Sequence, residues 1–216
     1  MMVVNDLAQV LFDALSNKKT KDRLDPQLTK HAKAYAAGVI TAIKVGITAQ
    51  PKVDGSTKPG SQLESGNSDN GTITNVMSDL MTAKITATFN QSNSGAIAQE
   101  NKAVCDYIMA TGKVKFESGT IKGKCVSDSN LLQGNGKLGR ITRLNGSALA
   151  NIVRSTFTSY FPKIPQETDM IRFYTALCDY IMANAEVEYA PGMVIGYCPK
   201  NPGALQGGSA SNGTIK

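Results

Sequence analysis

The sequence predicts an α+β protein built from three tandem repeats of about seventy residues, each a helix pair followed by a short β-hairpin and a polar loop. Residues 105–110 read Cys-Asp-Tyr-Ile-Met-Ala, and the same six residues return at 178–183, an offset of 178 − 105 = 73 residues. Apolar, glycine and cysteine positions match at this offset as far as Gly134 and Gly207. This match indicates a duplicated structural unit.

A third, more diverged copy lies at the N-terminus. Three stretches end alike, with Gly second and Ile fourth: 70–73, 138–141 and 212–215. We therefore divide the chain into three repeat units: 1–73, 74–141 and 142–216. Units this small are marginal alone, so we expect them to pack against one another, in a pseudo-threefold arrangement or a short row, or against partner subunits.

The first unit opens with an amphipathic helix that Asn5 or Asp6 can cap. Its apolar residues recur at helical spacing: Leu7, Val10, Leu11, Ala14 and Leu15. A second helix is expected from Pro26 to Ile43, followed by a strand at 44–48. The alignment with the second unit places Val45 and Ile47 under Val114 and Phe116, and Leu63 under Leu132 and Leu205.

The later units repeat the helix pair. We expect a helix near 76–81 and a long helix at 97–110 in the second unit. In the third unit, Ser147 and Thr168 are the expected N-caps of two helices, the second of which ends near Ala185.

Each helix pair is expected to lead into a hairpin. Residues 113–126 are predicted to turn at Ser118-Gly119, and residues 186–197 at Pro191-Gly192, where Pro followed by Gly suits a type II turn.

Two polar segments contain almost no apolar residues: 52–70 and 203–216. Segments of this kind are usually disordered unless a neighbour orders them. We therefore expect these loops to lie against other subunits of a larger assembly.

The composition is that of a folded protein with a small excess of positive charge. Of 216 residues, 41% are hydrophobic, and the net charge is +6. Basic residues cluster only at 18–23, which favours an ordinary solvated loop over a nucleic-acid patch. A signal peptide and a bilayer-length apolar run are both missing from the sequence, so we expect a protein made in the cytoplasm that does not enter a membrane.

The four cysteines occupy matched places in the last two units. Cys105 and Cys178 are expected on helices, and Cys125 and Cys198 on strands. A disulfide within each unit is one interpretation, but free buried thiols are favoured for a chain without an export signal. Zinc ligands at the usual close spacing are missing.

No catalytic constellation emerges from the sequence, so we expect a non-enzymatic protein without catalytic residues, metal or cofactor. His31 has no nucleophile or second histidine in its sequence context. The glycine spacing at 134–139 lacks the Lys-Ser/Thr of a phosphate loop. Asp106 and Asp179 are best explained as surface charges repeated by duplication.

The repeated hexapeptide itself is apolar and points to packing. The residues expected at packing or assembly surfaces are Tyr107, Ile108, Met109, Tyr180, Ile181 and Met182. At least one residue of each Tyr-Ile pair should be largely buried.

A helix that ends at 184–187 (Asn-Ala-Glu-Val) and runs directly into a short strand, with Gly/Ser/Asn loops after it, resembles small virion proteins of tailed bacteriophages. The resemblance implies a structural component of the tail, baseplate or neck, synthesised in the host cytoplasm and located in the virion. Its partners would be other virion subunits, as ring-forming or trimeric neighbours, together with possible self-association. It implies no catalytic residues.

Two alternatives to this structural function stay open. The first is a basic protein associated with nucleic acid, which would use the +6 charge. The second is an enzyme or ligand-binding protein.

Overall fold

The structure is a computed structural model that describes residues 1–16, 26–44, 47–57, 61–87, 94–126, 131–157, 167–199 and 203–216. The basic cluster at 18–23 lies outside them. The fold is mixed α and β, and the chain divides into two compact units. The helical unit comprises Met1–Val45, Val76–Thr111 and Leu144–Asn184, and the strand unit comprises Gly46–Asn75, Gly112–Arg143 and Ala185–Lys216.

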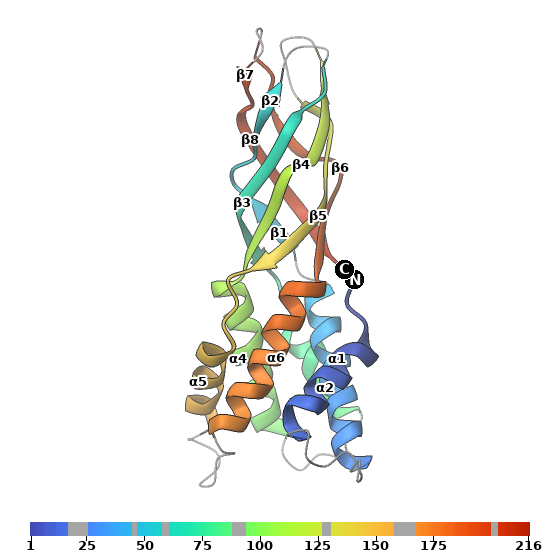
Figure 1. Cartoon of the computed structure of the whole chain (residues 1–216), viewed down its shortest axis with the longest axis vertical. Coiled ribbons are helices and arrows are strands. Elements are labelled where there is room, and N and C mark those ends of the chain that lie inside the picture. Colours follow the sequence, from blue (N-terminus) through green and yellow to red (C-terminus); the bar gives the residue numbers. More distant parts are fainter. Residues whose placement is uncertain are drawn as a thin grey trace. The chain divides into compact units, whose positions relative to one another are not determined.

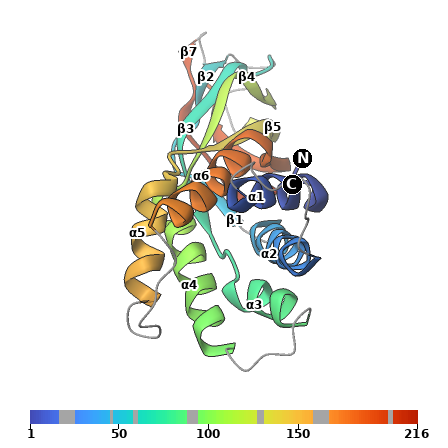
Figure 2. The same ribbon diagram turned by 60° about the horizontal axis from the view of Figure 1, so that its bottom comes forward.

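The described part of the helical unit contains six helices (Figures 1 and 2). They are α1 Val4–Ser16, α2 Pro26–Lys44, α3 Ser78–Thr86, α4 Ser94–Thr111, α5 Gly146–Phe157 and α6 Glu167–Asn184. Each helix packs against its neighbours in the sequence, and α6 also packs against α1. The helices therefore form a closed ring.

The helices form where the apolar spacing predicts them. The shorter helices α1, α3 and α5 each contain a fully buried residue whose amide donates to the carbonyl four residues earlier: Leu7 to Val3, Met81 to Met77, and Leu149 to Asn145. None of the predicted N-caps precedes its helix, because Asn5 and Asp6 lie within α1 and Thr168 lies within α6. Asn145, not Ser147, caps α5, because its Oδ1 accepts the Ala148 amide at 2.9 Å.

The strand unit is a closed, six-stranded barrel with two short additional strands (Figure 1). Its described strands are β1 Ile47–Gln50, β2 Asp54–Thr57, β3 Glu64–Thr74, β4 Lys113–Cys125, β5 Leu131–Thr142, β6 Glu186–Tyr197, β7 Gly203–Ala204 and β8 Gln206–Ile215. The order β1-β8-β6-β5-β4-β3 closes because β3 also pairs with β1, and all these pairs are antiparallel. Closure leaves no exposed edge in the main sheet.

The predicted hairpins at 113–126 and 186–197 are wrong, because each segment is one continuous strand. The expected turn at Ser118-Gly119 is a bulge in β4, where residues 116–120 lie opposite only 137–139 of β5. The left-handed backbone of Gly119 (φ 82°) and Gly192 (φ 86°) marks the same bulge in β4 and β6. The true pairing partners, β5 and β8, are the segments that the sequence presents as polar loops.

The polar segments 52–70 and 203–216 therefore do not need another subunit to order them, contrary to the expectation. They contribute β2, β3, β7 and β8, which pair within the chain. Their glycines permit close approach of neighbouring strands: a Cβ would collide with a facing carbonyl at Gly66 (Ile121) and Gly208 (Val53), as it would at Gly134 of β5 (Val194). The lack of apolar residues thus reflects tight strand packing.

Two alignments of the first unit also need correction. An isoleucine ends each of the three similar stretches 70–73, 138–141 and 212–215. On the neighbouring strand, Thr48 lies opposite Ile73, Val114 opposite Ile141, and Val187 opposite Ile215. Thr48 therefore takes the place expected for Val45, which lies outside the described residues, because the link from α2 to β1 is longer than the later links. Similarly, the sequence alignment places Leu132 with Leu63 and Leu205. In the structure, the buried Leu131 contacts Gly123 as Leu63 contacts Gly55 and Leu205 contacts Gly196.

Candidate functional site

The repeated hexapeptide lies near the C-terminal ends of α4 and α6, and it packs as predicted. Tyr107, Ile108, Tyr180 and Ile181 are all buried, with Ile181 fully so. Met109 and Met182 are half-buried. Asp106 and Asp179 are exposed, and Asp106 forms an ion pair with Lys102 at 2.5 Å.

The two repeated tyrosines share a second function that the sequence does not reveal. The Tyr107 hydroxyl accepts the Asn145 amide at 2.9 Å and donates to the Asn145 carbonyl at 3.0 Å. Tyr180 makes the same pair of bonds with Val3, at 2.9 and 3.0 Å. Each tyrosine therefore holds the backbone just before a shorter helix, α5 or α1.

A carboxyl group lies between two tyrosines within the helical unit. The Tyr174 hydroxyl on α6 donates to Glu100 Oε1 on α4 at 2.7 Å. Tyr35 on α2 packs edge-on against Phe173, with ring centroids 5.1 Å apart, and its buried hydroxyl makes no well-aligned hydrogen bond. Burial raises the pKa of Glu100, while the nearby Tyr174 and Tyr35 hydroxyls lower it.

Burial also raises the pKa of both tyrosines well above the ordinary value, and the Glu100 charge raises it further. These hydroxyls therefore stay protonated, and each keeps a proton that it can donate to the carboxylate. The cluster is a polar contact inside a packed core.

The barrel interior carries a second polar cluster next to β1. Thr48 donates to the Tyr189 hydroxyl at 3.0 Å, and Ser68 donates to Gln50 Oε1. Gln50 also reaches the Val114 carbonyl at 3.4 Å. The pKa of Tyr189 is raised to about 12, because the effect of burial exceeds the opposite effect of its hydrogen bonds with Thr48 and Gln50.

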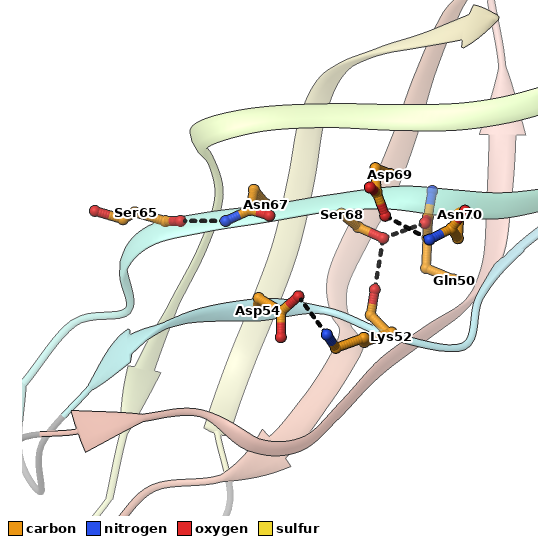
Figure 3. A network of polar contacts seen from close by, with 8 residues as sticks. All are labelled: Gln50, Lys52, Asp54, Ser65, Asn67, Ser68, Asp69 and Asn70. Atoms are coloured by element: carbon orange, nitrogen blue, oxygen red, sulfur yellow. Dashed lines mark hydrogen bonds and ion pairs between the residues drawn. The ribbon is translucent and has the colours of Figure 1, made fainter.

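Figure 3 shows how this cluster joins the barrel wall: Ser68 lies between the Gln50 side chain and the Lys52 carbonyl. More exposed contacts surround it, with Asn67 donating to the Ser65 carbonyl and Lys52 paired with Asp54 at 3.3 Å. The interior bonds satisfy buried polar atoms, whereas the outer ones contribute little to stability.

The disulfide lies within the strand unit and joins two of the predicted repeats, 74–141 and 142–216. Cys125 and Cys198 form a disulfide, and Cys105 and Cys178 are free and buried. The prediction of free thiols is thus correct for the helix cysteines and wrong for the strand cysteines. Thr57 completes the group, because its hydroxyl lies 2.9 Å from Cys125 Sγ. Closure of the sheet brings these three strand ends together, and the sequence gives no signal of that proximity.

Burial, together with a smaller contribution from the adjacent Asp106 and Asp179, raises the pKa of the Cys105 and Cys178 thiols to about 12. Both groups therefore stay as inert thiols near neutral pH.

Two hollows occur on the described surface. One, of about 550 Å³, lies between α4 and α5 and is lined by Tyr107, Ile152 and the Lys102–Asp106 pair, among others. The other, of about 430 Å³, lies over β4 and β5 and is lined by Lys122, Asn135, Lys137, Leu138 and, from β6, Glu186.

The remaining sequence candidates carry no assembled site. His31 is exposed on α2, and residues 134–139 form part of β5. Among the described residues, no group of three His, Cys, Asp or Glu side chains could hold a metal ion. None of the described helices is long and apolar enough to span a membrane.

No protein-family model matches the chain, and searches of curated proteins and of solved structures return no significant match.

Proposed function

We propose that this chain is a non-enzymatic structural component of a bacteriophage particle, in the tail, baseplate or neck, built as three tandem repeats about a pseudo-threefold axis. The proposal keeps the resemblance of the helix-to-strand junction to virion proteins. It assigns two helices and two barrel strands to each repeat, of which β1 is short.

The observation that carries the proposal is a contact that recurs once in each repeat. A Cβ added at Gly55, Gly123 or Gly196 would collide with a leucine that lies eight or nine residues further along the chain: Leu63, Leu131 and Leu205, respectively. All three leucines are buried. One matched contact in each repeat supports a pseudo-threefold arrangement.

A second set of matched positions supports the same symmetry. Gly71, Gly139 and Gly213 face large interior side chains: Gln50, Phe116 and Tyr189. Phe116 and Tyr189 also touch, with ring centroids 5.5 Å apart. A chain with three similar faces suits a position on a symmetry axis or in a ring, where it meets several copies of a neighbour.

The disulfide supports the virion as the location of the protein. Disulfides are rare in the reducing cytoplasm and persist on virion and cell surfaces. Cys125–Cys198 fits a protein that is synthesised in the cytoplasm and then leaves it inside a released particle.

The experiment is mass spectrometry of gradient-purified particles from the host culture that carries the gene. We expect peptides of this chain in a fixed ratio to the major capsid protein, and a protein of the host lysate serves as the contamination control. Recovery of the chain only in the particle-free fraction would overturn the proposal.

A further inference from the structure

Contrary to the expectation that basic residues cluster only at 18–23, net positive charge also accumulates over one strand pair. Residues 112–143 contain seven Lys/Arg and two Asp/Glu, a net charge of +5 out of the +6 of the whole chain. Six of the basic residues lie on β4 and β5, and we call them the basic ridge: Lys113, Lys115, Lys122, Lys124, Lys137 and Arg140.

Strand alternation turns the basic ridge outward. Ile121 and Cys125 are buried inside the barrel, whereas Lys122 and Lys124, on the opposite face of β4, are exposed. Across the ladder, Lys122 lies opposite Asn135 and Lys115 opposite Arg140. The ridge therefore runs along a hairpin whose longer strand extends about 40 Å.

The ridge is only partly neutralised. Lys115 is paired with Glu117 at 2.7 Å, and Glu186 lines the hollow that Lys122 and Lys137 also line. Within the described part of the chain, no carboxylate forms an ion pair with Lys122, Lys124 or Lys137. Like charges on neighbouring strands repel, so a partner that supplies negative charge would stabilise this face.

The composition of the ridge distinguishes between two kinds of anionic partner. A protein interface centres on buried aromatic or apolar anchors with charges at the rim. Among the described residues of β4 and β5, Leu138 is the one exposed large apolar side chain beside the ridge lysines. An extended row of separate cations instead suits a chain of phosphates, which binds by neutralisation and counterion release.

We propose that the basic ridge binds the phosphate backbone of a nucleic acid, with Lys122, Lys124 and Lys137 as its principal contacts. This inference is independent of the virion proposal: a particle component without the ridge interaction would leave that proposal intact.

The test measures fluorescence anisotropy of a labelled DNA duplex of about 30 base pairs with the full chain, from about 50 to 300 mM KCl. Each phosphate contact contributes about 0.9 to the slope of log K against log salt. We expect the triple variant K122Q/K124Q/K137Q to lose about 2 to 3 from that slope and to bind at least about tenfold more weakly at 0.1 M salt. The matched control, K33Q/K44Q/K84Q, removes the same charge from exposed sites of the helical unit and should keep the slope.

A second measurement uses the unmodified chain. DNA should protect Lys122, Lys124 and Lys137 from acetylation, read by mass spectrometry, and leave Lys33 and Lys44 reactive. The proposal is overturned by absence of DNA binding at 50 mM salt, by equal loss in the control variant, or by unprotected ridge lysines. Polyglutamate that binds as tightly as DNA would also overturn it, in favour of an acidic protein partner.

Discussion

At the residue scale, the chain places several polar groups where a simple core would be apolar. Glu100, between Tyr35 and Tyr174, is the clearest example, because its only well-aligned described partner is the Tyr174 hydroxyl. One hydrogen bond does not compensate for the transfer of a carboxylate from water. Ionised Glu100 therefore lowers the stability of the helical unit.

We expect Glu100→Gln to raise the free energy of unfolding at neutral pH. The folded-state pKa lies above the ordinary 4.5, so the wild type loses stability as pH rises from about 4.5 through the raised pKa. The gain in the variant should be complete above that pKa and vanish at about pH 4. Urea unfolding across this range measures it, with the exposed Glu64→Gln as control. A variant less stable than the wild type at pH 7 would contradict this explanation.

The residues of the repeated hexapeptide could be predicted because duplication preserved their packing. Tyr107 and Ile181 are buried as expected. The interior polar residues Thr48 and Gln50 could not be predicted, because they break the apolar alternation that marks a strand. Only the repeat alignment could have located them, and a longer link before β1 shifts that alignment.

At the scale of the elements, helices were predictable and strand pairing was not. Helical spacing locates α2 and α4 to within a few residues. By contrast, β3 and β8 are rich in Gly, Ser and Asn and resemble loops in composition. A bulge with a left-handed glycine favours the same residue types as a turn, so the sequences of β4 and β6 each resemble a hairpin.

The disulfide gives a prediction about how β4 and β6 are held together. Cys125 and Cys198 are 73 residues apart, so their bond should contribute about 4 kcal/mol through loss of unfolded-chain entropy. Reductant should lower the unfolding free energy of the wild type by about that amount and leave C125A/C198A unchanged. Denaturant titrations with and without reductant measure this.

The control pair is C105A/C178A, which removes the two free thiols. It should keep the full sensitivity to reductant. Loss of that sensitivity would instead indicate disulfides within the predicted repeats, Cys105 with Cys125 and Cys178 with Cys198.

At the scale of the whole molecule, the two links from a barrel strand to the next helix, β3 to α3 and β5 to α5, are alike. Asn75 and Arg143 have left-handed backbones, with φ of 61° and 65°. Each precedes a buried residue, Val76 or Leu144. Under the proposed repeat, Met1 corresponds to the left-handed position, and buried Met2 to Val76 and Leu144.

A circular permutant should therefore fold. We expect a chain that begins at Val76, joins Lys216 directly to Met1 and ends at Asn75 to melt within a few degrees of the wild type. A matched permutant opened between Lys115 and Phe116 interrupts β4 and should be strongly destabilised. Equal loss of structure in both permutants, measured by circular dichroism, would contradict the repeat equivalence.

Closure of the barrel within one chain is the central structural claim, and β8 tests it most directly. This strand pairs with β6 on one side and β1 on the other, so its amides are protected only if the first and last parts of the chain meet. Hydrogen exchange on the isolated monomer should show residues 206–215 protected as strongly as β5, which lies between β4 and β6. Nearly unprotected exchange in β8 beside a protected β5 would contradict closure and mean that the C-terminal segment is ordered only by another subunit.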